Sequence, residues 1–311
     1  MLTYGIFIDS ERQFCDDSVE KPSETLNSSS FPGPRMPLIL SLIDPSATLP
    51  IEAQGLIPEL LRDKSLAEIQ HLPVLCGNAL LPLGELFLVS GSAADGQLEF
   101  SGDHSQVHWI GSGMTTGSIR VTGAAGRHAG SGLAGGELVI DGNAGDWAGA
   151  EMRQGLIRIR GSVGAQAGGV YVGGTKGMTG GTLLIHGDAG HEAGRCLRRG
   201  LIAIGGRCGD FPGFNMLAGA MLVLGPSGVR PAAGMRRGTL ALLHRTCPPV
   251  LPTFRCAAVL QPTAFRLILK RLEQLDFPFD AALYEQPLEI FRGDMVVGGK
   301  GEILRPVATS V

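Results

Sequence analysis

The sequence has few aromatic residues and no long apolar run. Aromatic residues make up 5% of the 311-residue chain, so any core must be built mainly from aliphatic side chains. The longest apolar run, PLILSLI at residues 37–43, falls well short of the roughly 18 residues that span a bilayer. The N-terminus lacks a basic segment followed by an apolar stretch. We therefore expect no signal peptide, no membrane association and a cytoplasmic protein.

The cysteines and the net charge exclude further classes. None of the six cysteines forms a C-x-x-C pair, which disfavours zinc, iron–sulfur and thioredoxin-like sites. We expect reduced thiols and no metal or cofactor bound by this chain itself. The formal net charge of -3 disfavours generic nucleic-acid binding.

Glycine, by contrast, is abundant and periodic. The 47 glycines are about twice the usual share. The glycines that open successive units are Gly117, Gly136, Gly155, Gly181, Gly200, Gly219 and Gly238. Successive spacings are 19 residues, except one of 26, where the segment GGVYVGGTKGMTGG carries seven extra residues. Two more glycine columns follow, six and nine residues after the opening glycine.

Aliphatic residues keep the same period. They stand two and four residues after each opening glycine, as at Ile119 and Val121 or Ile157 and Ile159. Alternate residues of a strand share a face, so these pairs point to one interior. One unit cannot bury them alone, whereas stacked units bury every column together. The pattern predicts an all-β fold: a single-stranded, right-handed parallel β-helix of about seven or more 19-residue turns, with short flanking helices and glycines at its corners.

Two glycine-rich segments superficially resemble nucleotide loops. GSGLAG at residues 130–135 satisfies G-x-G-x-x-G but leads into a strand rather than a helix. The segment around Lys176 lacks the G-K-[ST] order of a P-loop. We interpret both as turns of the repeat.

Composition and periodicity divide the chain into four segments. We expect residues 1–35 to be a disordered extension or a mis-assigned start, and residues 36–95 to form an N-terminal cap with a strand, a short helix after Ser65 and the first strands. Residues 96–245 are the predicted β-helix, and residues 246–311 a cap of one helix and short strands. The helix, within PTAFRLILKRLEQL, is expected to cover the open end of the coil.

No set of residues suited to catalysis emerges. His104 and His108 lie near Asp103 like metal ligands, but no third ligand accompanies them. Carboxylates are sparse in the repeats and form no column of the kind that sugar-cleaving enzymes require. We predict no catalytic residue and no metal site.

Basic residues are concentrated in the repeats. From Gly117 to Gly238 there are 13 Lys or Arg and seven acidic residues, whereas the flanks are acidic. Stacking the repeats places Arg153, Arg198 and Arg236 in one column and Arg199 and Arg237 in the next. Such a column could hold an extended anion through charge-assisted hydrogen bonds. A solvated turn, or salt bridges to an acidic partner polypeptide, would explain the same pattern.

The repeat resembles a known family. The unit GELVIDGNAGDWAGAEMRQG (residues 136–155) is similar to the glycine repeat in the C-terminal domain of the glutamate synthase large subunit, in the C subunit of formylmethanofuran dehydrogenase, and in its counterpart in the bacterial formyltransferase/hydrolase complex. The tail, with PTFRCAAVLQPTAFRLILKRL, IFRGD and GGKGEIL, resembles the ending of the formylmethanofuran dehydrogenase C subunit. The resemblance covers roughly residues 36–305.

This resemblance implies a non-catalytic structural subunit of a one-carbon complex. Its partners would be a hydrolase (A-type) subunit, where zinc is expected, a B-type subunit and a formyltransferase (D-type) subunit. The complex would oxidise formaldehyde to formate through tetrahydromethanopterin and a methanofuran-type carrier with a polyglutamate tail. Whether the complex is bacterial or archaeal in type, and whether the arginines bind carrier or partner, stays open. Two alternatives remain: a stand-alone glutamate synthase-like domain and a β-helix enzyme acting on polysaccharides.

Overall fold

The computed structural model describes residues 36–46 and 48–307, so the extension predicted at residues 1–35 lies outside the described residues. The helices are α1 (Pro58–Leu61), α2 (Leu66–Gln70), α3 (Leu83–Leu86), α4 (Thr263–Gln274), and the 3-10 helices η1 (Ala281–Tyr284) and η2 (Met295–Val297). The strands before the repeats are β1 (Leu38–Leu42), β2 (Ile51–Glu52), β3 (Pro73–Cys76), β4 (Ala79–Pro82), β5 (Phe87–Ser90), β6 (Gln97–Phe100) and β7 (Val107–His108). The remaining strands are β8 (Ser118–Val121), β9 (Ala134–Ile140), β10 (Gln154–Ile159), β11 (Thr182–Ile185), β12 (Leu201–Ile204), β13 (Ala220–Val223), β14 (Arg237–Leu242), β15 (Arg255–Leu260), β16 (Leu288–Gly293) and β17 (Lys300–Pro306). Among these residues, no helix combines the length and the apolar composition that a membrane crossing requires.

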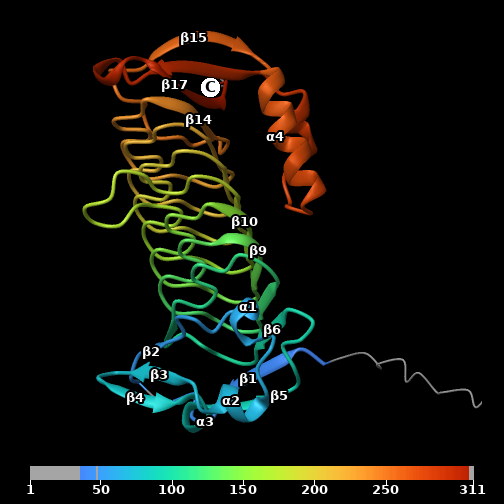
Figure 1. Cartoon of the computed structure of the whole chain (residues 1–311). Helices are drawn as coiled ribbons and strands as arrows, with labels where there is room; N and C mark the ends of the chain where they lie inside the picture. The colour runs from blue at the N-terminus through green and yellow to red at the C-terminus, as the bar shows by residue number, and fades with distance from the viewer. Residues whose placement is uncertain (1–35, 47, 308–311) are drawn as a thin grey trace, which may run out of the picture. The chain divides into compact units, whose positions relative to one another are not determined.

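Most strands belong to one mixed sheet of 13 strands. Its order is β15-β16-β17-β14-β13-β12-β11-β10-β9-β8-β6-β1-β5, and a second sheet has the order β4-β3-β2-β7. From β6 through β14 each strand of the larger sheet pairs in parallel with the next, and β17 continues the series after β14. The register follows the sequence repeat, with Ile119 opposite Leu138 and Ile157 opposite Leu183. Figure 1 shows the resulting stack of turns.

The turns also pair away from the strands. A chain of single-residue parallel bridges runs along the stack: His104, Ala125, Ala144, Val163, Ala189, Cys208 and Ser227. Beyond them, Gly149 N donates to Ala129 O at 2.8 Å, and Gly168 N to Ala148 O at 2.8 Å. Backbone hydrogen bonds between adjacent turns therefore continue around the coil.

The columns predicted to face inward form the core. Ile157, Ile159, Leu183 and Ile185 are fully buried, and so is Met152 of the column preceding the strands. One cluster of buried side chains extends along the interior from Leu38 to Ile303. Burial of these aliphatic groups supplies the main stabilisation of the coil, because each turn alone leaves them in water.

The glycine columns have two distinct physical causes. The seven opening glycines all have positive φ, between 72° and 103°, where a side chain would be strained. The column six residues later has no positive φ, but a Cβ on Gly142 would lie 2.7 Å from Gly123 C of the preceding turn. The first column allows both the corner and the close approach of the preceding turn, because a Cβ on Gly136 would lie 2.5 Å from Gly117 O; the second column allows the approach alone.

The coil begins earlier than the repeats do. β1 pairs in parallel with β6, and β2 with β7, so residues of the expected N-terminal cap already share the register of the stack. The predicted helix after Ser65 is confirmed as α2, whose capping box joins Ser65 and Glu68. Strand β5, which we expected among the opening strands of the coil, instead pairs antiparallel with β1 at the edge of the sheet.

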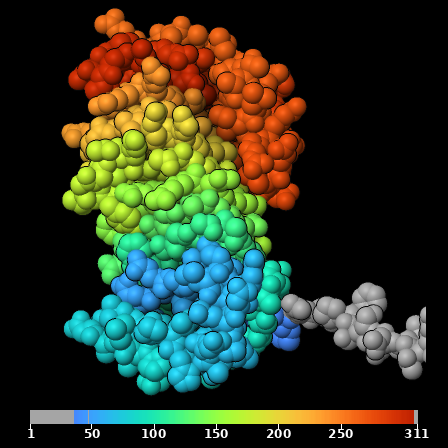
Figure 2. All heavy atoms as spheres, viewed as in Figure 1, coloured from blue at the N-terminus to red at the C-terminus, as the bar shows by residue number. Residues whose placement is uncertain are grey.

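The predicted C-terminal helix is confirmed as α4, but its expected position at the end of the coil was wrong. Phe265, Leu269 and Leu272 pack instead against Ala203 and Leu222 on the outward side of the strands. Beyond the last turn, the sheet continues from β17 to β16 and then to β15, and both pairings are antiparallel. Figure 1 and Figure 2 show α4 alongside the turns. The helix lies there because the outward residues of β11–β14 are apolar and require cover.

Candidate functional site

The repeat brings three of the predicted arginines to the same position on every second turn. The backbone N–H of Arg153 donates to Leu133 O at 2.7 Å, that of Arg198 to Met178 O at 2.9 Å and that of Arg236 to Met216 O at 2.8 Å. Thr179 and Leu217 occupy the intervening turns of this column through equivalent bonds to Met152 O and Leu197 O. Arg199 and Arg237 follow Arg198 and Arg236 in the chain, as the repeat requires. We call these five arginines the arginine edge.

The arginine edge has no internal counter-charge. Six other arginines form ion pairs with carboxylates: Arg120, Arg160, Arg195, Arg266, Arg292 and Arg305. Within residues 36–46 and 48–307, no carboxylate lies within 4.0 Å of a guanidinium nitrogen of the arginine edge. All five side chains are exposed or half-buried. Their donors are therefore available to an external anion.

A groove of about 510 Å³ lies beside this edge. Its lining residues are Thr175, Lys176, Cys196, Asn215, Leu217, Gly234, Arg236 and Val297. We call it the edge groove. Lys176 comes from the seven-residue insertion, here named the insertion loop (residues 170–176), and Val297 from η2. Burial raises the pKa of the Cys196 thiol, although Arg195 and Arg236 act in the opposite direction. The groove therefore presents two cations and a neutral thiol.

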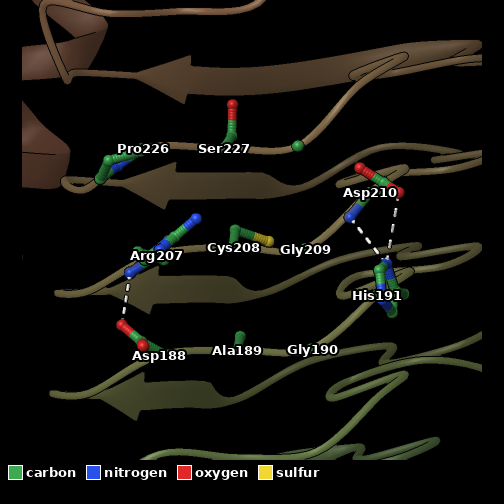
Figure 3. Close-up of a pocket in the computed structure, with 11 residues that line it drawn as sticks. Asp188, Ala189, Gly190, His191, Arg207, Cys208, Gly209, Asp210, Pro226 and Ser227 are labelled. Atoms are coloured by element: carbon green, nitrogen blue, oxygen red, sulfur yellow. Dashed lines mark hydrogen bonds and ion pairs between the residues drawn. The ribbon is translucent and has the colours of Figure 1, made fainter.

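A second hollow, of about 430 Å³, lies on the side of the single-residue bridges (Figure 3). It contains Asp188, His191, Arg207, Cys208 and Asp210, which include types used in catalysis. Asp188 Oδ1 accepts from Arg207 N at 2.7 Å, and His191 Nδ1 accepts from Asp210 N at 3.0 Å. Burial raises the pKa of the Cys208 thiol to about 12, so it stays protonated near neutral pH. These groups connect adjacent turns and do not converge on a reacting atom.

The same connection recurs along the coil. Asp146 Oδ1 accepts from Ala165 N at 2.7 Å, and Asp210 Oδ1 accepts from Val229 N at 2.9 Å. Each carboxylate thus bonds the backbone 19 residues later, one turn further along. Asp146, Asp188 and Asp210, three of the seven acids of the repeats, are therefore structural bridges between turns.

His104 and His108, which resemble metal ligands in the sequence, bond to different backbone groups. His104 is fully buried, stacks on Phe87 with ring centroids 6.2 Å apart, and donates from Nδ1 to Gly102 O at 2.9 Å. His108 Nδ1 accepts from Arg127 N at 3.0 Å. No group of three or more His, Cys, Asp or Glu suited to a metal ion occurs among the residues that the structure describes.

The repeat stacks His128 and Trp147 in one column, and the structure shows a ladder of aromatic rings there. Trp109 stacks on His128 with centroids 4.1 Å apart, and His128 stacks on Trp147 at 5.1 Å. Tyr171, from the insertion loop, lies across all three, and its hydroxyl is 2.8 Å from His128 Nδ1. Burial first, then Arg127 and His108, lower the pKa of His128 to about 4. The positions 109, 128 and 147 are spaced by 19, and this spacing was the available signal.

The fold and the site define a glycine-repeat coil with a basic edge. No protein-family model matches the chain. A chain of the crystal structure of the formyltransferase/hydrolase complex (FhcABCD) from Methylorubrum extorquens in complex with methylofuran matches with a TM-score of 0.80 and 32% identity. The match covers 86% of the present chain and 99% of the other.

Curated relatives match over shorter segments. The C subunit of the molybdenum-containing formylmethanofuran dehydrogenase 1 of Methanothermobacter marburgensis is 40% identical over 83 residues, which are 26% of this chain and 21% of that protein. The C subunit of the tungsten-containing formylmethanofuran dehydrogenase 2 of Methanothermobacter thermautotrophicus is 36% identical over 86 residues, 26% of this chain and 32% of that protein. The matched segment thus spans about a fifth to a third of these two relatives. The present chain belongs to the C-subunit family of formylmethanofuran dehydrogenase and the formyltransferase/hydrolase complex, as its repeat and tail predicted.

Proposed function

We propose that this chain is a non-catalytic structural subunit of a formyltransferase/hydrolase-type complex in one-carbon metabolism. The observation that carries the proposal is the structural match, which covers 99% of a chain of such a complex at 32% identity. The second hollow, which contains Asp188, His191 and Asp210, supports a structural role, because these side chains bond the backbone of neighbouring turns. The complex would oxidise formaldehyde to formate through tetrahydromethanopterin and a methanofuran-type carrier.

The fold proposed for this role is a single-stranded, right-handed parallel β-helix. The parallel register between successive turns supports it, and right-handed connection is the rule for parallel crossovers. In this proposal residues 36–95 form an N-terminal cap, residues 96–245 the β-helix, and residues 246–311 a C-terminal segment whose strands continue the sheet beyond the last turn and whose helix covers the outward side of the strands. A coil of this kind offers long faces to other subunits.

The proposed partners are a hydrolase (A-type) subunit carrying zinc, a B-type subunit and a formyltransferase (D-type) subunit. Co-purification of the tagged full-length chain from its native cells tests this assignment. Recovery of a zinc-hydrolase subunit and a formyltransferase subunit is expected. Recovery of glutaminase or synthase polypeptides would support a glutamate synthase-like domain instead, and a purified chain that cleaves a polysaccharide would contradict both.

The arginine edge is proposed to bind an anion within the complex, either the carrier's polyglutamate tail or an acidic partner surface. Its five arginines support this, because no carboxylate of the described chain neutralises them. Charge reversal by Arg198→Glu and Arg236→Glu should weaken complex assembly or carrier retention by about tenfold or more. Both quantities are measured on the purified complex, by subunit stoichiometry and by bound carrier. Unchanged values for both would contradict the proposal.

A further inference from the structure

We infer that the edge groove is a docking site for an acidic, partly apolar segment of a partner polypeptide. This inference rests on the proposed function, because it needs a complex in which partner polypeptides are present. The proposed docking site combines Arg236 of the arginine edge with the insertion loop and η2.

Two projections bound the groove along the coil. Lys176 stands at one end, on the insertion loop, which projects from the side of the stack (Figure 1). Val297 of η2 stands at the other end, and the floor contains Cys196, Asn215 and Gly234, which are 19 residues apart. Gly177 and Gly234 occupy the same position on turns that are three steps apart. With about 4.8 Å between turns, the two positions are about 14 Å apart along the coil. An extended peptide of about four residues has this length.

The insertion loop is fixed at both ends. The hydroxyl of Tyr171 lies 2.8 Å from His128 Nδ1 and 2.8 Å from Ser131 Oγ, and Tyr171 N donates to Glu151 Oε1 at 3.3 Å. At the other end, Gly177 N donates to Cys196 O at 2.9 Å. The aromatic ladder thus holds the loop that presents Lys176. A fixed loop loses less conformational entropy when a partner binds.

The opposite wall is fixed by one aspartate. Asp294 is buried, and its carboxylate accepts from Gly234 N at 3.1 Å and from Val296 N at 3.1 Å. These bonds connect η2 to the last turn of the repeat. The groove is therefore bounded by two walls whose positions are set before any partner arrives.

The charge of the groove favours an acidic occupant. Lys176 and Arg236 line it, and Arg198 lies two turns before Arg236 in the arginine column. Across the described ranges, no carboxylate lies within 4.0 Å of the side-chain nitrogens of these three residues. Carboxylates of a partner would supply the missing counter-charges and orient its approach.

Apolar side chains around the groove favour a polypeptide over a simple oligocarboxylate. Val172 on the insertion loop is fully exposed at 101%, and in η2 Val296 is 76% and Met295 49% exposed. An oligocarboxylate alone would leave these side chains in water, whereas apolar residues of a protein segment would cover them. The combination of cations and Val297 in the groove with exposed apolar side chains on the two bordering segments fits an acidic segment that also carries apolar residues.

The test compares three variants of the full-length chain, each co-expressed with the other subunits and immobilised. The first is Lys176→Glu with Arg236→Glu, and the second is Val172→Ser with Val296→Ser. The matched control is Lys270→Glu with Arg271→Glu, which makes the same charge change at exposed positions of α4. Retained partner polypeptide is quantified as NaCl is raised stepwise, and circular dichroism establishes that each variant is folded.

The groove charge variant should retain about tenfold less partner than wild type, and its retention should depend less on salt. The apolar variant should also lose partner but keep the wild-type salt dependence, and the control should match wild type. If the charge variant does not fold, Lys176→Gln with Arg236→Gln takes its place.

Wild-type retention by both groove variants would overturn the inference. A charge variant that retains partner polypeptide normally but binds the probe tetraglutamate more weakly than wild type would also overturn the inference. The groove would then hold a free oligocarboxylate. A wild-type chain that retains no partner would contradict the proposed function itself.

Discussion

Glycine has two purposes in this repeat, and the backbone distinguishes them. Gly132 has φ of 64°, and a Cβ on it would meet no atom within 4 Å, so a side chain is disfavoured there only by conformation. At Gly142 the backbone angle is ordinary, but a Cβ would lie 2.7 Å from Gly123 C and Gly123 O. Backbone atoms of a stacked turn cannot yield as a flexible side chain can.

The substitution Gly142→Ala should therefore destabilise the protein more than Gly132→Ala. We expect a loss of about 2–3 kcal/mol for Gly142→Ala, from overpacking against the preceding turn. Gly132→Ala should cost about 1 kcal/mol, from the left-handed conformation alone. Urea unfolding followed by circular dichroism measures both. The reverse order would show that close approach between turns is not what requires the second glycine column.

The neutral state of His128 predicts a pH dependence of stability. Burial, Arg127 and His108 lower its pKa to about 4, whereas Asp146 acts in the opposite direction. The unfolded chain, with an ordinary pKa near 6.5, binds the proton more readily. The resulting stability is fully present above pH 6.5 and is lost as the pH falls towards 4, by less than the roughly 3 kcal/mol of the full shift, because solvent screens the partly exposed ring.

The variant His128→Phe should weaken this dependence while keeping the stacking, because His104, His108 and His186, whose pKa values burial also lowers, remain. Phe211 already occupies the equivalent corner with φ of 60°, so the chain accepts phenylalanine in that conformation. The measurement is the urea midpoint of wild type and variant between pH 7 and pH 4. Parallel curves for the two proteins would contradict the assignment to His128.

At the scale of elements, the outward residues of the strands determine where α4 lies. Early turns place Arg120 and Arg158 outward, whereas β11–β14 place apolar residues there. The outward apolar residues are Leu184, Ala203, Leu222 and Ala241. The change from alternating strands such as SIRV to continuous apolar strands such as TLLI and LIAI was visible in the sequence. Continuous apolar strands indicate burial on both faces, whereas the inward column alone predicts burial on one face.

The contact between α4 and the strands can be weakened selectively. Leu269 is fully buried against them, whereas Leu267 on the same helix is 66% exposed. We expect Leu269→Ala to cost about 2–5 kcal/mol and Leu267→Ala less than about 0.5 kcal/mol. Hydrogen exchange of the α4 amides should accelerate only in the first variant. Equal exchange in both would show that α4 does not depend on this contact.

At the scale of the molecule, periodicity predicted what repeats and failed where the repeat ends. The core columns and the stacking of Arg153, Arg198 and Arg236 followed from a spacing of 19. The edge groove did not, because Lys176 and Val297 come from an insertion and from the tail, and only the folded chain brings them together. Likewise, β17 joins β14 across more than 50 residues that carry no repeat.

The C-terminal segment should keep the coil from associating through its last turn. Truncation after Leu243 removes β15–β17 and α4, which exposes the edge of β14 and the outward apolar residues. Such an edge pairs readily with another chain, so we expect oligomers or precipitation, measured by light scattering. A chain truncated after Val307 keeps all these elements and is the control. A monomeric, folded product of the longer truncation would contradict this role.

Because each turn mainly contacts its immediate neighbours, the length of the coil is set by the number of its turns. Deleting residues 200–218 would join Arg199 to Gly219, and both flanking segments would meet in matching register. The two ends would come closer by about 4.8 Å, and the outward surface that α4 covers would lose Ala203. The number of turns therefore sets the separation between whatever binds at one end and whatever binds at the other, and selection can adjust that separation in whole steps.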